Sequence, residues 1–271
     1  MIARKRFGQH FLEPAWVVKV VNAIAPAPGD EFIEIGPGRG ALTEPLTARA
    51  RSVTAFEIDR DLASALRASA PPNLTVVEGD FLESDWLLKH RPANPIRVAG
   101  NLPYNVASPI MFKLIDVYDS GIPLADATLM LQREVADRLL ARPSTKEYGV
   151  LSVLVRLSAD AERLLNLPAG AFRPAPKVQS ALIRLRFHPP SPAPQDRRLF
   201  TAMVQAVFTR RRKTIENALL AFRPGDRAGI GAALDRSGTD RRRRPETLDI
   251  PELVRLADAF STLPAPPQAV L

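Results

Sequence analysis

An amide, a proline and an aromatic ring follow one another at Asn101-Leu102-Pro103-Tyr104. Asn101 offers an amide oxygen, and Leu102 and Pro103 offer backbone carbonyls. These acceptors suit methylation of an adenine amine, because holding both of its N–H bonds turns the lone pair toward an electrophile. Tyr104 can stack on a base drawn out of its helix, a contact worth about 1–3 kcal/mol. An ordinary turn around the proline is the alternative.

Three glycines within five residues, Gly36, Gly38 and Gly40, follow the apolar run Glu31–Ile35. The run is typical of a buried parallel strand, and helical spacing resumes over residues 41–46. A tight turn from strand to helix leaves backbone N–H groups available, and glycine lets a ligand approach them. The G-x-G-x-G spacing differs from the dinucleotide fingerprint G-x-G-x-x-G, which argues against a nicotinamide oxidoreductase. A plain glycine-rich turn remains the alternative.

Acidic residues fall at the ends of the next two predicted strands. Glu57 ends the strand over Val53–Glu57, and Asp80 follows the strand over Leu74–Glu78. Because open α/β sheets bind ligands at the carboxyl ends of their strands, Glu57 can accept the hydroxyl groups of a ribose. Asp80 can accept from an adenine amine while Phe81 covers the ring, although Asp80 also suits a helix N-cap. We therefore predict a nucleoside site at this edge of the sheet.

The order of strand and helix patterns predicts two domains. Residues 1–187 are predicted to form an α/β domain with seven strands, mostly parallel, of which Ala181–Phe187 alternates in hydrophobicity and is antiparallel. Four prolines within His188–Pro194 mark the boundary, and strand signals stop beyond it. Residues 188–271 are predicted to be all-α, with helices over 199–208, 214–222, 230–234 and 250–260.

Positive charge gathers near the two ends of a chain whose formal net charge is +8. Such clusters are typical of a surface that contacts a polyanion, although a solvated surface is the alternative. A stretch bearing phenylalanine adjoins the N-terminal cluster, which favours RNA as the partner. The predicted RNA-binding residues are Arg4, Lys5, Arg6, Arg210, Arg211, Arg212, Lys213, Arg241, Arg242, Arg243 and Arg244.

The composition excludes several classes of site. The chain has no cysteine and three widely separated histidines, which rules out disulfides and thiolate chemistry and disfavours a metal centre. Residues 15–27 form an amphipathic pattern rather than a signal peptide. No apolar run reaches the roughly 18 residues that a membrane span needs. We therefore expect a cytoplasmic protein with no metal and no membrane contact.

Together these motifs resemble those of the rRNA adenine N6-dimethyltransferases. The resemblance covers nearly the whole chain and is carried by 9–12, 34–43, Glu57, 79–80, 101–105, 172–180 and 208–217. It implies a class I, Rossmann-like methyltransferase domain that uses S-adenosylmethionine, plus a small helical RNA-recognition domain. Within the family the small-subunit branch is most similar; loss of that enzyme gives kasugamycin resistance.

The resemblance further implies dimethylation of two adjacent adenosines in the 3′-terminal hairpin of 16S rRNA. The expected partner is the 30S subunit or its precursor, and the enzyme is expected to act as a monomer in subunit maturation. By position, the implied cofactor residues are His10, Leu12, Gly36, Gly38, Glu57, Asp80, Phe81 and Asn101. The implied residues at the target base are Asn101, Leu102, Pro103, Tyr104 and Phe172.

His10 departs from the family pattern, and Phe172 has an alternative role. The family usually has Asn where this chain has His10, whose ring can still donate a hydrogen bond. Two prolines hold Phe172 on a stiff loop, where it could sandwich the base against Tyr104, but a lone Phe in a proline-rich loop is more often simple packing.

Two other functions remain open. A dimethylase of large-subunit rRNA, the type that confers macrolide resistance, shares the catalytic motifs; the arginine-rich C-terminal region favours the small subunit. A non-catalytic ribosome-assembly or transcription factor could use the same fold. The intact motif over residues 101–104, together with Glu57, argues against a pure scaffold.

Overall fold

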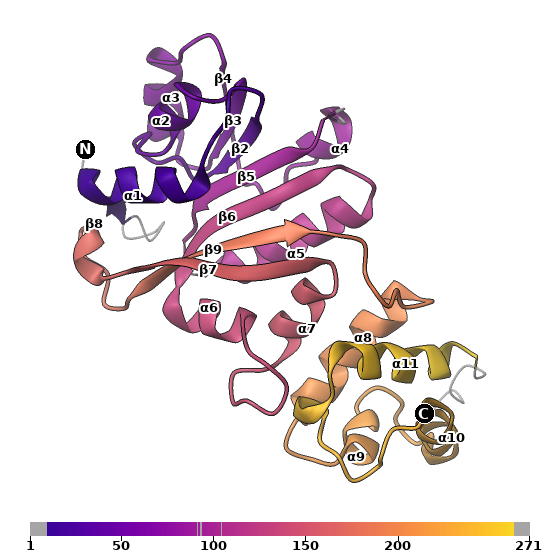
Figure 1. Ribbon diagram of the computed structural model, residues 1–271. Helices are drawn as coiled ribbons and strands as arrows, with labels where there is room; N and C mark the ends of the chain where they lie inside the picture. The colour runs from indigo at the N-terminus through magenta and orange to yellow at the C-terminus, as the bar shows by residue number, and fades with distance from the viewer. Residues whose placement is uncertain (1–9, 91, 93, 104, 263–271) are drawn as a thin grey trace. The chain divides into compact units, whose positions relative to one another are not determined.

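The computed structural model describes residues 10–90, 92, 94–103 and 105–262 (Figure 1). The chain divides into two compact units, Met1–Ala136 with Asp160–Phe187 and Asp137–Ala159 with His188–Leu271. The predicted domains differ from this grouping in the segment 137–159, which groups with the helical residues. Tyr148 gives one reason: its buried hydroxyl donates to the Leu248 carbonyl at 2.9 Å.

The helices and strands follow the alternation that the sequence predicts. In chain order they are β1 (Phe11–Leu12), α1 (Pro14–Ile24), β2 (Glu31–Ile35), α2 (Thr43–Thr47), β3 (Ser52–Glu57), α3 (Arg60–Ala68), β4 (Leu74–Glu78), α4 (Trp86–His90), β5 (Ile96–Asn101), α5 (Ala107–Asp119), β6 (Leu124–Gln132), α6 (Arg133–Leu139), α7 (Val150–Arg156), β7 (Ala159–Leu167), β8 (Phe172–Arg173), β9 (Ser180–Phe187), α8 (Arg197–Thr209), α9 (Ile215–Leu219), α10 (Arg227–Ser237) and α11 (Ile250–Ser261).

Seven strands form one sheet in the order β4-β3-β2-β5-β6-β9-β7 (Figure 1). The pairs β3–β4, β2–β3, β2–β5 and β5–β6 are parallel, and β9 pairs antiparallel with β6. The predicted fold class, a mostly parallel seven-stranded sheet, is confirmed. The chain leaves β2 toward β3 on one side and later enters β5 on the other. The carboxyl ends of β2 and β5 therefore flank the switch point at which such sheets bind ligands.

The central strand β2 is apolar because it is paired on both sides and covered on both faces. Phe32, Ile33 and Ile35 are each at most 4% exposed, which explains the nearly continuous apolar run in the sequence. Gly100 on β5 is required by the close approach of the two strands: a Cβ there would lie 2.7 Å from the Ile35 carbonyl oxygen. No local pattern around Gly100 indicated this constraint.

A separate two-stranded sheet pairs β1 with β8, so that Phe11 lies opposite Arg173 and Leu12 opposite Phe172. It was not predicted, because strands of two residues leave no periodic pattern. A second difference concerns residues 81–83, which form a turn before α4 and not the helix that an N-cap at Asp80 would begin. Every helix in the described part of the chain is too short or too polar to cross a bilayer.

The helical unit has a core of its own, built from residues such as Phe200, Leu219 and Phe260. Its helices begin at side-chain caps: Asp196 accepts from two backbone N–H groups at the start of α8, and Asp249 forms a capping box with Glu252 at the start of α11. All four predicted helices are present, although α9 ends three residues earlier than expected.

Candidate active site

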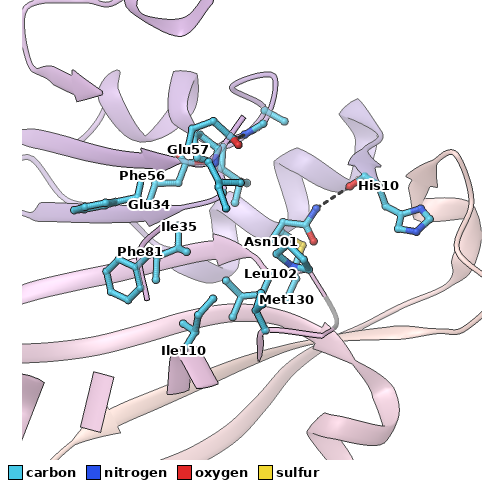
Figure 2. A pocket seen from close by; sticks show the side chains of 18 of the residues that line it. His10, Glu34, Ile35, Phe56, Glu57, Phe81, Asn101, Leu102, Ile110 and Met130 are labelled. Carbon is cyan, nitrogen blue, oxygen red and sulfur yellow. Dashed lines mark hydrogen bonds between the residues drawn. The ribbon is translucent and has the colours of Figure 1, made fainter. Parts of the chain in front are cut away.

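A cavity of about 330 Å³ lies at the carboxyl ends of β2, β3, β4 and β5 (Figure 2). Its volume falls at the lower end of the range for small-molecule sites. The cavity brings together residues from four strand ends and from the N-terminal segment. The predicted site residues that line it are His10, Leu12, Gly36, Gly38, Glu57, Asp80, Phe81, Asn101, Leu102 and Pro103.

The glycine loop has the backbone geometry that its sequence predicts. Gly36 and Gly38 have φ values of +70° and +61°, which L side chains rarely adopt. A Cβ on Gly38 would also come within 3.3 Å of the Phe11 ring. The loop therefore brings bare backbone to the cavity wall, as a close-bound ligand requires.

The Glu57 carboxylate is held against the glycine loop. Its Oε2 accepts from the Gly38 N–H and its Oε1 accepts from the Asp59 N–H, both at 2.9 Å. Burial raises the pKa of Glu57, and these two N–H groups partly offset the rise because they favour the charged form. Each carboxylate oxygen keeps a further lone pair. Glu57 can therefore still accept hydrogen bonds from the hydroxyls of a ribose.

Glu34 also lines the cavity, although it was not predicted as a site residue. It is 1% exposed, and its Oε2 has no hydrogen-bond partner within the described residues. Burial raises the pKa of Glu34 to about 8, and the nearby Glu57 carboxylate adds to the rise. Glu34 is therefore a neutral acid at pH 7. One feature of the sequence could have identified Glu34 as a site residue: it is a charged residue within the apolar run Glu31–Ile35, which forms a buried strand.

Glu34 makes the stability of the protein depend on pH. Its folded-state pKa lies above the unfolded value, so its contribution is complete below pH 4.5 and is lost as the pH rises to about 8. We expect the unfolding free energy of the wild type to fall relative to Glu34→Gln by at most about 1.4 kcal/mol per pH unit in that window. Urea unfolding of both proteins at several pH values measures the difference; a constant difference would contradict the assignment.

Asn101 ends β5 at the cavity, with its amide orientation fixed by one hydrogen bond. Its Nδ2 donates to the His10 carbonyl at 2.8 Å, so its Oδ1 faces the other way (Figure 2). That oxygen is the acceptor which the predicted chemistry needs. The backbone carbonyls of Leu102 and Pro103 follow directly, whereas Tyr104 lies outside the described residues.

His10 joins the N-terminal segment to the proline-rich loop. Its ring Nδ1 lies 2.7 Å from the Pro174 carbonyl and donates to it, because a carbonyl can only accept. The residue thus holds Asn101 through its backbone and the loop through its ring. The N–H donor that the sequence predicted for the His10 ring therefore binds a backbone carbonyl of the protein, that of Pro174.

Phe172 is the one predicted catalytic residue in the described chain that does not line the cavity. Its side chain is 2% exposed and belongs to the hydrophobic core that includes Leu12, Val21 and Ile24. The structure therefore favours the packing interpretation of Phe172 over a grip on the target base. The prolines of this loop carried no information on where the Phe172 ring points.

Asp80 lies at the start of the turn that follows β4, on the cavity wall. Its Oδ1 accepts from the Leu82 N–H at 2.8 Å and so fixes the turn after β4, while the residue also lines the cavity. The neighbouring Phe81 ring lines the cavity as well and packs edge-on against Phe56 at 5.3 Å between centroids.

The predicted RNA-binding residues of the helical unit divide into two groups. Arg211, Arg241 and Arg243 form ion pairs with Glu246, Asp235 and Glu252, respectively. The other members are exposed, and no ion pair is found for them among the described residues. These are Arg210, Arg212, Lys213, Arg242 and Arg244.

The two basic runs of the helical unit lie side by side. The Ile215 N–H, just after the first run, donates to the carbonyl of Arg243 in the second at 2.6 Å. Arg241 of the second run also pairs with Glu216, next to Ile215. Residues 4–6 lie outside the described residues.

Comparison with known proteins decides the family. The model of the ribosomal RNA adenine dimethylase family matches residues 2–238 of this chain. The chain belongs to this family. Ribosomal RNA small subunit methyltransferase A of Acinetobacter baylyi is 44% identical over 94% of this chain and 92% of its own length. The protein of the same name from Variovorax paradoxus is 42% identical over 97% of this chain and 99% of its own length.

Solved structures agree with the family in fold. A dimethyladenosine transferase from Plasmodium falciparum superposes with a TM-score of 0.75 at 24% identity, over 91% of this chain and 96% of that one. The 23S rRNA methyltransferase ErmE superposes with a TM-score of 0.64 at 29% identity, over 93% and 100% of the two chains. As a member of the dimethylase family the chain is an rRNA adenine methyltransferase, as the motifs predict.

Proposed function

We propose that this enzyme dimethylates the N6 amines of two adjacent adenosines in the 3′-terminal hairpin of 16S rRNA, within the 30S subunit or its precursor. The observation that carries the proposal is that the strand-end carboxylates Glu57 and Asp80 line the same cavity as the Asn101 amide. The printed names of the bacterial relatives support the small subunit as substrate. Action as a cytoplasmic monomer in subunit maturation is part of the proposal.

The cavity residues fit S-adenosylmethionine as the cofactor. Glu57 would accept from the ribose hydroxyls and Asp80 from the adenine amine, while Phe81 would cover the ring. The buried Glu34 Oε2 without a partner is a polar atom that a ligand could satisfy. When bound, the cofactor supplies an electrophilic methyl group on a sulfonium.

The residues at the end of β5 would orient the target amine. Asn101 Oδ1 and the carbonyl of Leu102 or Pro103 can each accept one N–H bond of an adenine amine. The nitrogen lone pair would then face the methyl group that the cofactor supplies, and the amine proton released on methylation would pass to solvent, so no strong base would be needed. Positioning of this kind can supply several kcal/mol of the barrier reduction, up to roughly 7–11 kcal/mol. Tyr104 is proposed to stack on the base.

The exposed basic residues are proposed to hold the RNA phosphates. Among the described residues no ion pair is found for five basic residues, so their charge is available to a polyanion: Arg210, Arg212, Lys213, Arg242 and Arg244. The adjacent paired arginines instead fix the two turns that carry them. Arg4, Lys5 and Arg6 are proposed to add contacts from the N-terminal arm.

A direct assay separates this proposal from methylation of the large subunit. Tritiated S-adenosylmethionine is incubated with the enzyme and either unmethylated 30S subunits or protein-free 23S rRNA, and the product nucleosides are identified. We expect N6,N6-dimethyladenosine from the 30S sample, with two adjacent modified positions after sequencing. Transfer to 23S rRNA instead would favour the activity named for ErmE. Label in neither sample would favour a non-catalytic role.

A further inference from the structure

Lys113 on α5 reaches across to the loop that follows β4. Its Nζ lies 2.6 Å from the Phe81 carbonyl, 2.7 Å from the Leu82 carbonyl and 2.6 Å from the Ser84 carbonyl. An ammonium group has three N–H donors and no acceptor, so all of its donors are used by one short stretch of backbone. Lys113 was not among the residues that the sequence suggested for the site.

The same loop is fixed at its other end by Asp80. The Asp80 carboxylate accepts from the Leu82 N–H at 2.8 Å, and its backbone carbonyl accepts from the Glu83 and Ser84 N–H groups at 3.1 Å each. These bonds satisfy the N–H groups of a single helical turn, but they leave its later carbonyls without the partners that a continuing helix would supply. Lys113 supplies those partners.

We infer that Lys113 is a positioning residue for recognition of the cofactor's adenine, because it holds the loop that presents Asp80 and Phe81 to the cavity. The inference rests on the proposed function. Both presented residues line the cavity, and the Lys113 Nζ also lies 5.3 Å from the centroid of the Phe81 ring. Lys113 itself does not line the cavity, so it acts through the loop.

The setting of Lys113 distinguishes it from an ordinary surface lysine. Burial lowers its pKa, and the negative charges of Asp80 and Asp85 act in the opposite direction. Asp85 is already paired with Lys89 at 2.9 Å, so the Lys113 ammonium is directed to the loop carbonyls rather than to that carboxylate. A lysine whose only role is solubility extends into solvent, whereas Lys113 makes three short hydrogen bonds to a loop that lines a cavity.

Lys113→Met tests this assignment, because Met keeps much of the aliphatic stem and has no N–H donors. The probes are S-adenosylhomocysteine and S-inosylhomocysteine, which differ in the amine that Asp80 would recognise. We expect the Kd of the variant to rise about tenfold for the adenine ligand and only about two- to threefold for the inosine ligand, because displacement of Phe81 affects both bases whereas displacement of Asp80 affects the amine alone; kcat at saturating cofactor should be nearly unchanged. The loss of preference is the decisive readout.

Controls keep a general loss of stability apart from the proposed role. Lys89→Met removes an exposed lysine that is paired with Asp85 in the same region, and it should leave both affinities unchanged. Lys113→Gln, which retains donors at a shorter reach, serves as a second variant and should lose preference as well. Equal weakening of both ligands, or no change, would overturn the inference. Failure of the proposed function would give a different result: the wild-type enzyme would still prefer S-adenosylhomocysteine to S-inosylhomocysteine but would not methylate 30S subunits.

Discussion

Asn101→Ala is expected to lower the rate of methyl transfer at saturating cofactor by about 10²–10³-fold, the usual cost of removing one preorganised polar group from a reacting centre. The Oδ1 acceptor disappears, so the target amine loses one of the two groups that direct its lone pair. The same variant leaves the His10 carbonyl without its Nδ2 donor. Cofactor binding should remain measurable because Glu57 and Asp80 are untouched.

Single-turnover methylation of 30S subunits, with cofactor affinity measured separately, tests this expectation. Asn94→Ala is a matched control, because Asn94 precedes the amino end of β5 and bonds to Glu31 far along the strand from the cavity. It should transfer methyl groups at nearly the wild-type rate. Undiminished turnover by Asn101→Ala would reject the role of the amide. If Asn101→Ala loses cofactor binding instead, the role of Asn101 is to bind the cofactor and not to orient the target amine.

Replacing Arg210, Arg212 and Lys213 together by Ala should weaken binding to unmethylated 30S subunits by about 100-fold or more, because each charge-assisted contact to phosphate is worth roughly 1.5–3 kcal/mol. The slope of log affinity against log salt concentration should also fall by about two to three, because fewer counterions are released. Filter binding over a range of salt concentrations gives both quantities. The three side chains make no ion pairs within the described residues, so folding should be little affected.

A control variant with the same change in net charge distinguishes direct contact with RNA phosphates from the general electrostatic attraction of a basic protein to RNA. Arg227, Arg236 and Arg255 are exposed on α10 and α11 and belong to neither basic run. Their joint replacement by Ala should reduce affinity less than about threefold and leave most of the salt slope unchanged. Equal effects of the two triple variants would contradict a localised RNA contact.

Much of the cavity could be predicted because its residues sit at strand ends. The run over Glu31–Ile35 fixes β2, and the position of Glu57 and Asp80 after the next two strands places them at the same edge. Asn101 follows in the same way from β5. Pattern and order were sufficient for these residues, because parallel strands bring their carboxyl ends together whatever the details of packing.

The missed features depend on contacts between distant residues. Phe172 and Glu34 have side chains whose direction is set by tertiary packing: Phe172 enters the core and Glu34 lines the cavity. Lys113 reads as an ordinary polar residue on an amphipathic helix until the loop it contacts is known. The grouping of the segment 137–159 likewise rests on contacts such as that from Tyr148 to Leu248, 100 residues away. Local pattern carries no signal for any of these.

The pairing of β1 with β8 bears on when the enzyme becomes competent during its own synthesis. Leu12, which walls the cavity, finds its strand partner only at Phe172, and the His10 ring bonds to Pro174. A ribosome must therefore translate about 160 codons beyond the first wall residue before that wall can close. Newly made chains should capture the methyl donor only once the segment around residue 174 has emerged, well after the glycine loop and its acidic neighbours are in place.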